Sequence, residues 1–155
     1  MKKKLFILAL LLICFSITFT VVSEKDGLSV DDYISLGNNM GVNGNHIEAE
    51  KAFKNALKID PYYIPAYLGL GSAYGNAGRI VDAIEVFKEG IKLNPSHKSV
   101  PQLQMSIALL AFHKMNDNVT AVKYAKKALQ RFTDQGDFFG VALAGQKLKQ
   151  FVPGA

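Results

Sequence analysis

Apolar residues recur at helical spacing in two short segments near the start of the charged part of the chain. They predict helices at about 31–42 and about 46–58, because each segment places its apolar side chains on one helical face. The turn residues Asn43-Gly44-Asn45 separate the two segments, and Pro61 follows the second. Proline cannot continue a helix, so the pattern predicts one helix-turn-helix pair that ends there.

The same pattern returns once more along the chain, at one constant offset that defines a 34-residue period. The pairs at this offset are Tyr33 and Tyr67, Leu36 and Leu70, Gly37 and Gly71, Ala49 and Ala83, Phe53 and Phe87, and Pro61 and Pro95. A unit of this length has room for two short helices and two turns, but it cannot bury its apolar face alone. The sequence therefore predicts two units, at 30–63 and 64–97, which stack and bury Tyr33, Leu36 and Phe53 in a shared core.

The second unit has an aromatic residue, Leu-Gly and another aromatic residue in its first helix, then Ala-x3-Phe in its second helix and a final proline. These positions are Tyr67, Leu70, Gly71, Tyr74, Ala83, Phe87 and Pro95. This order resembles the tetratricopeptide repeat. The first unit departs from it at Met40, where the second aromatic residue would stand. The resemblance implies an all-α solenoid of helix-turn-helix pairs.

A third, degenerate unit is predicted at 98–135. The step from Ala83 to Ala121 exceeds the period by four positions, and the extra residues fit a loop at about 96–101. Leu109 stands where the pattern has glycine and Ala125 where it has phenylalanine. A larger residue on one helix and a smaller one on its partner would compensate in volume.

A final helix is predicted at 137–151, with Asp137 as its N-cap. Terminal repeats need a helix that covers the last apolar face and presents polar residues outward. The polar residues that fit this outer face are Gln146, Lys147, Lys149 and Gln150. The segment is therefore predicted to be a capping helix of the 30–151 domain.

The N-terminal residues 1–23 begin with three lysines and continue with an apolar run, and a polar linker follows at 24–29. This layout predicts a secretory signal peptide. The alternative is an uncleaved anchor, because residues 5–22 carry no charge and 18 helical residues at about 1.5 Å each nearly span a bilayer core of roughly 30 Å. Cleavage is favoured because the strictly apolar part is short. Both alternatives predict repeats outside the cytoplasm, secreted, periplasmic or anchored by a single span, with the N-terminal segment engaging the membrane or the export machinery.

Charge and composition exclude some partners. The formal net charge is +5, but residues 24–155 carry 15 basic and 13 acidic residues, a net of +2, because Lys2, Lys3 and Lys4 precede them. No basic stripe with interleaved aromatic residues is present, so no nucleic-acid partner is predicted. The one cysteine, Cys14, lies in the apolar run, so the remaining chain has no thiol to form a disulfide.

Motifs for catalysis are absent from the sequence. There is no Gly-x-Ser-x-Gly elbow, no phosphate-binding glycine loop and no histidine pair at metal spacing. His46, His97 and His113 lie one in each unit. The sequence predicts no catalytic residue, no cofactor and no metal, and hence a protein that is not an enzyme. The triplet starting at Asn118 matches a glycosylation acceptor, which would matter only in a eukaryotic secretory pathway.

The tetratricopeptide resemblance implies a partner-binding groove, because the first helices of successive repeats line a concave surface in that family. The positions implied here are Ile34, Asn38, Leu68, Ser72, Asn76, Leu103, Ser106 and Leu110. Family members that act as chaperone adaptors clamp a terminal carboxylate with Lys, Arg and Asn. Of those positions only Asn38 matches, so we expect no such clamp.

The resulting functional prediction is a scaffold or adaptor that binds a partner peptide or helix in this groove. The alternative is structural self-assembly, in which the degenerate edges of the array stack on another copy and form a homo-oligomer.

Overall fold

The computed structural model describes residues 27–152, and the secondary structure within this range is entirely α-helical. The seven helices of this range are α2 (Val30–Val42), α3 (His46–Ile59), α4 (Ile64–Asn76), α5 (Ile80–Leu93), α6 (Val100–Met115), α7 (Asn118–Asp134) and α8 (Phe138–Phe151). The all-α class predicted from the sequence is confirmed here. The predicted signal peptide or anchor at 1–23 lies outside the described residues. None of the helices found between residues 27 and 152 is long and apolar enough to span a membrane.

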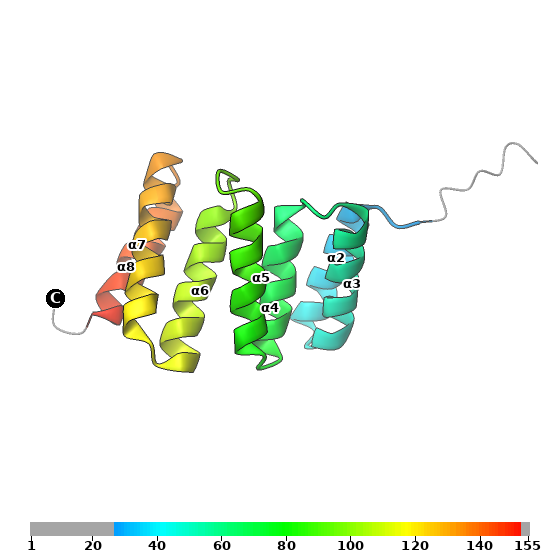
Figure 1. The fold of residues 1–155 in the computed structure, drawn as a ribbon, viewed down its shortest axis with the longest axis horizontal. Coiled ribbons are helices and arrows are strands. Elements are labelled where there is room, and N and C mark those ends of the chain that lie inside the picture. The colour runs from blue at the N-terminus through cyan, green and yellow to red at the C-terminus, as the bar shows by residue number, and fades with distance from the viewer. Residues whose placement is uncertain (1–26, 153–155) are drawn as a thin grey trace, which may run out of the picture.

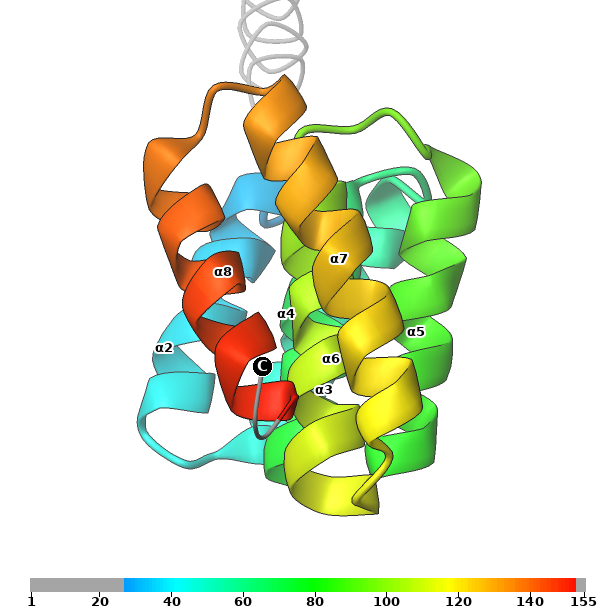
Figure 2. The same ribbon diagram turned by 90° about the vertical axis from the view of Figure 1, so that its left-hand side faces the viewer.

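The helices follow one another along the long axis of the molecule, each antiparallel to the next (Figure 1). Each helix packs on its neighbour in sequence, and α4 additionally contacts both α2 and α6. The helices α2, α4 and α6 therefore form one layer, and α3, α5 and α7 lie on the other side of it (Figure 2). This is the two-layered solenoid that the helical pairs predicted.

The turns between helices repeat in geometry. Gly44 and Gly78 lie one period apart, and both have positive φ, 79° and 80°. Glycine adopts this conformation without a Cβ clash. Asn116 follows Gly78 by the same longer step that separates Ala83 from Ala121, and it takes the same left-handed region with φ 54°. Asparagine is among the few other residues that adopt it at low cost, so the third turn keeps the shape without glycine.

Glycines on the first helix of a pair meet a phenylalanine of the second. A Cβ at Gly37 would lie 2.7 Å from the ring of Phe53, and a Cβ at Gly71 would lie 2.4 Å from the ring of Phe87. Both distances are far shorter than a van der Waals contact, so each ring needs a residue without a side chain opposite it. Phe53 and Phe87 are only 3% and 1% exposed and belong to the main core cluster.

The third pair reverses this arrangement. Ala125 is fully buried in the second core cluster, and Leu109 of α6 packs against the same cluster. Bulk therefore comes from the first helix of this pair, whereas it comes from the second helix in the two earlier pairs. The predicted exchange of volume between positions 109 and 125 agrees with this packing.

One predicted core residue is wrong. Leu36 is 37% exposed, although its equivalent Leu70 is 5% exposed. The reason is position in the solenoid: no described helix precedes α2, so the face that carries Leu36 has no described neighbour. Tyr33 is half-buried for the same reason.

Polar contacts tie the first two repeats together around Glu50. Its carboxylate accepts hydrogen bonds from Lys54 Nζ at 2.6 Å, Arg79 Nη1 at 3.1 Å and the hydroxyl of Tyr74 at 3.2 Å. The Arg79 guanidinium also lies 4.1 Å from the centroid of the Tyr74 ring and donates to Asp82. Burial alone would raise the pKa of Glu50, but the hydrogen bonds and charges of Lys54 and the other donors outweigh it and lower the pKa.

Candidate peptide-binding groove

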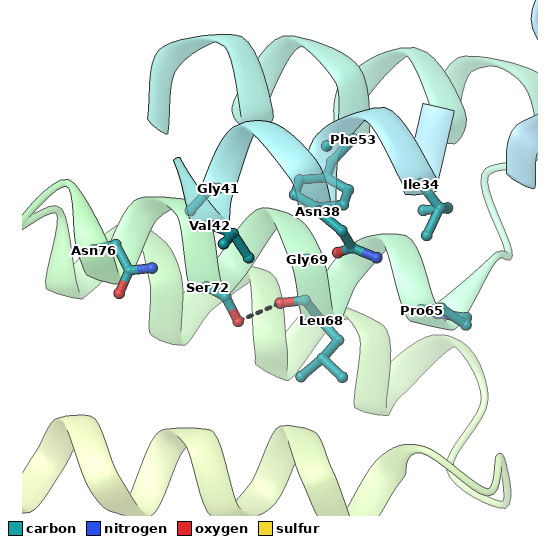
Figure 3. Close-up of a pocket in the computed structure, with 12 residues that line it drawn as sticks. Ile34, Asn38, Gly41, Val42, Phe53, Pro65, Leu68, Gly69, Ser72 and Asn76 are labelled. Carbon is teal, nitrogen blue, oxygen red and sulfur yellow. Dashed lines mark hydrogen bonds between the residues drawn. The ribbon is translucent and has the colours of Figure 1, made fainter. Parts of the chain in front are cut away.

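A pocket of about 480 Å³ opens between α2 and α4 on the layer formed by the first helices (Figure 3). We call it the α2–α4 pocket. Its lining residues are Ile34, Gly37, Asn38, Gly41 and Val42 from α2, Pro65, Leu68, Gly69, Ser72, Ala73 and Asn76 from α4, and Phe53 from α3. The lining is mainly apolar, and none of these residues carries a formal charge.

Glycine gives this pocket its depth. Gly37 and Gly69 face Phe53 from the two sides, and a Cβ at Gly69 would lie 2.3 Å from its ring. Because neither glycine has a side chain, the Phe53 ring forms the floor of the pocket even though it belongs to the core. Ile34 and Leu68 form apolar walls, and the Ser72 hydroxyl donates to the backbone carbonyl of Leu68 at 2.7 Å.

A second pocket of about 190 Å³ lies between α4 and α6, and we call it the α4–α6 pocket. It is lined by Gly71, Ser72, Gly75, Asn76, Phe87, Ser106, Leu109, Leu110 and Lys114. Its floor is Phe87, one period after Phe53. Ser72 and Asn76 line both pockets, so the two pockets adjoin each other across α4. Together they form one groove across the first helices.

The structure brings together seven of the eight residues predicted for the groove. Ile34, Asn38 and Leu68 line the α2–α4 pocket, and Ser106 and Leu110 line the α4–α6 pocket; the two shared residues are those named above. Whether any of them contacts a partner stays a prediction.

Leu103 is the exception, and its assignment to the groove is wrong. The residue is 0% exposed and belongs to the main core cluster. Gly90 of α5 leaves room for it, since a Cβ at that position would lie 2.8 Å from Leu103 Cδ2. The side chain therefore packs toward α5, away from the groove.

Sequence reasoning missed several contributors to the groove, of which four carry a side chain that bears on its chemistry. Phe53 and Phe87 were assigned to the core alone, although the glycines opposite them were a signal that no side chain separates their rings from the groove. Pro65 was not assigned because the first turn of a helix gives no facial pattern. Lys114 was not assigned either, and its signal was its charge in the last turn of a groove-forming helix.

The electrostatics of the groove are simple. Among the described residues that line its two pockets, Lys114 alone carries a formal charge. Asp31, at the start of α2, accepts a hydrogen bond from the Tyr63 hydroxyl at 2.6 Å, and this bond raises the pKa of Tyr63. Within residues 27–152, no group of three or more His, Cys, Asp and Glu side chains could hold a metal ion. The groove therefore offers apolar surface, amides and hydroxyls, and one cation.

Several solved structures share this fold. PcrH from Pseudomonas aeruginosa is 22% identical, with a TM-score of 0.72 over 84% of this chain and 98% of that chain. PcrH in complex with the chaperone binding region of PopD is 22% identical, with a TM-score of 0.70 over 81% and 94%. The Yersinia enterocolitica type III secretion chaperone SycD, in complex with a peptide of the translocator YopD, is 20% identical, with a TM-score of 0.68 over 78% and 90%. At these identities the likeness establishes the fold.

These comparisons overturn one prediction, which placed the repeats outside the cytoplasm as a secreted, periplasmic or membrane-anchored domain. The structural neighbours include the type III secretion chaperone SycD, and none of the helices between residues 27 and 152 could span a membrane. The prediction rested on the composition of residues 1–23 alone. An apolar run after lysines does not by itself determine where the repeats are located. The repeats themselves carry no signal of location.

Sequence comparison matches part of the chain to a known repeat. No curated protein matches the chain significantly. A family profile, that of the tetratricopeptide repeat, matches residues 43–110, which include α3, α4 and α5 and most of α6. These are the helices that form the α4–α6 pocket and one wall of the α2–α4 pocket. The tetratricopeptide repeat resemblance predicted from the sequence is therefore confirmed over residues 43–110.

Proposed function

We propose that this protein is a non-enzymatic adaptor that binds an extended, apolar segment of a partner protein in the groove across α2, α4 and α6. The observation that carries the proposal is the pair of adjoining pockets, which share Ser72 and Asn76 and have phenylalanine floors one period apart. Each pocket is concave and mainly apolar, which is the character of sites that accept an apolar side chain.

The geometry favours a segment with two apolar anchors. Packed helix axes lie about 8–10 Å apart, so pockets on the two sides of α4 are separated by roughly that distance. An extended chain rises about 3.3 Å per residue, and anchors about three residues apart would therefore reach both pockets. Full burial of each anchor contributes about 1.5–3 kcal/mol. The amides of Asn38 and Asn76 are placed to bond the backbone of the segment between the anchors.

Similar structures support a peptide partner. One of the complexes described above contains PcrH with the chaperone binding region of PopD, and the other contains the chaperone SycD with a peptide of the translocator YopD. We infer the chemistry of the partner from the residues that line the groove of this chain, and not from the partners of the similar structures. No arrangement of a nucleophile, a base and an orienting group contributes to the groove lining, which favours binding over catalysis.

The proposal is tested by blocking the groove. Peptides selected from a random library on the wild-type protein would be titrated by fluorescence anisotropy against Leu68→Glu, Ser72→Trp and the control Val81→Glu. We expect at least about tenfold weaker binding to the first two variants, because one places a charge in an apolar wall and the other places a large side chain where the two pockets adjoin. Val81 is 63% exposed at the start of α5, in the opposite layer, and its variant should bind as wild type does.

Two results would count against the groove. One is a wild-type protein that selects no peptide, and the other is a selected peptide that binds all variants equally. Ser72 is exposed, so its replacement keeps the core intact and serves as a check if Leu68→Glu unfolds the protein. Circular dichroism of each variant establishes that it is folded.

Self-assembly is the second candidate. The outer face of α2 has no described neighbour and exposes Leu36, and Leu28 before it is 48% exposed. A dimer of SycD exists among the structures with this fold. Light scattering over a dilution series tests the idea: a dimer that Leu36→Glu dissociates supports it, and a monomer at every concentration removes it.

A further inference from the structure

Lys114 places a positive charge at the edge of a groove whose other lining residues are uncharged. The residue lies in the last turn of α6, is exposed and lines the α4–α6 pocket. The ion pairs among residues 27–152 involve Glu50, Lys54, Arg79 and Asp82, and Lys114 is in none of them. Its charge is therefore not neutralised by the described part of the chain.

The two helices on either side of the α4–α6 pocket supply no counter-ion. Helix α4 contains no charged residue, and α6 contains no acidic residue. Asp117 is the nearest acidic residue in sequence, but its carboxylate caps α7 by accepting from the Thr120 backbone N–H at 2.9 Å. Hydrogen bonds from the Thr120 side chain and backbone lower the pKa of Asp117 and hold its carboxylate at the start of α7, and it forms no ion pair with Lys114. An unpaired cation thus stands at the edge of a pocket that is otherwise uncharged.

We propose that the partner segment carries an Asp or Glu side chain next to the apolar anchor of the α4–α6 pocket, and that this carboxylate pairs with Lys114. The proposal rests on the proposed function and specifies the chemistry of its ligand. A side-chain carboxylate and a C-terminal carboxylate share this chemistry, and the test below distinguishes them.

Lysine at a helix C-terminus also has a purely structural role, since it interacts favourably with the helix dipole. Lys92 is the matched control for that role. It lies in the last turn of α5, is exposed, and belongs to the opposite layer of the solenoid. Lys92→Glu and Lys114→Glu lose the same dipole interaction, but only Lys114 borders a pocket of the groove.

The test is a selection from one library of short random peptides on wild type, Lys114→Glu and Lys92→Glu. We expect Asp or Glu beside an apolar residue to be enriched on wild type and on Lys92→Glu, and Lys or Arg at the same place on Lys114→Glu. A peptide selected on wild type should bind Lys114→Glu about twofold to fivefold more weakly, the size of an exposed ion pair. Added salt should reduce this difference.

Each outcome decides one question. If wild type and Lys114→Glu both select peptides but enrich the same residues, the pairing with Lys114 is refuted and the groove stands. If wild type selects nothing, or if its peptides bind Ser72→Trp equally well, the proposed function itself fails. If amidation of the peptide's C-terminus abolishes the difference between the variants, the carboxylate is a chain end and the side-chain assignment is wrong.

Discussion

Gly71→Ala is the most direct test of the packing that forms the groove. The added methyl group would lie 2.4 Å from the Phe87 ring, which is 1% exposed and has core residues around it. Overpacking of this kind costs about 1–3 kcal/mol. The same change removes a glycine from a helix interior, which contributes about 1 kcal/mol in the opposite direction. We therefore expect Gly71→Ala to be destabilised by about 0–2 kcal/mol in net terms.

Gly145→Ala is the matched control. Gly145 lies inside α8, and no side chain or distant backbone atom lies within 4 Å of a Cβ built on it. Its variant should gain the helix-propensity term alone, about 1 kcal/mol. The difference between the two variants isolates the steric overlap, about 1–3 kcal/mol, which corresponds to roughly 2–4 °C in Tm per kcal/mol for a domain of this size.

The assay is urea unfolding followed by far-UV circular dichroism, with thermal unfolding as a second measurement. Wild type, Gly71→Ala and Gly145→Ala are compared under one buffer condition. If Gly71→Ala is as stable as Gly145→Ala, the close approach of Gly71 and Phe87 is not what makes glycine necessary, and the argument for the pocket floor loses its basis.

Two further predictions concern the turns and the link between repeats. Glu50→Gln should destabilise the protein by about 1 kcal/mol near neutral pH. The folded pKa of Glu50 lies below its ordinary 4.5, so this difference in stability is present above pH 4.5 and disappears as the pH falls through the lowered pKa. Urea unfolding at several pH values measures it. Equal effects of the substitution at acidic and neutral pH would contradict the assigned bonds. Gly78→Ala should lower the unfolding free energy by about 1–2 kcal/mol because the φ of Gly78 is positive. Asn116→Gly should be neutral or stabilising at the equivalent turn. The reverse order of stabilities would refute this account of the turns.

The sequence was sufficient for the arrangement of helices because the 34-residue period fixes which residues share a face. That period placed Ile34, Leu68 and Ser72 on one layer, and the structure has them around one pocket. Leu36 could not be placed correctly, because the repeat pattern makes it the equivalent of Leu70. The pattern does not show that α2, unlike α4, has no described helix before it.

Other features depend on contacts between elements that a pattern does not contain. Leu103 was misplaced because the direction of its side chain is decided by the space that Gly90 leaves on another helix. Phe53 and Phe87 are core residues, as the pattern predicts. Their rings also line the groove, because the residues opposite them are glycines without side chains. The composition of residues 1–23 led to a wrong location because it described the segment and not the repeats.

The exchange of bulk between Leu109 and Ala125 has a consequence for what the protein can recognise. In the first two pairs a phenylalanine of the second helix forms the floor of the pocket, because the residue opposite it on the first helix is glycine. In the third pair Leu109 stands on the first helix and Ala125 on the second, so position 125 supplies no aromatic ring between α6 and α7. Under the proposed function, the length of the bound segment follows from the two pockets with phenylalanine floors and not from the number of helices in the solenoid.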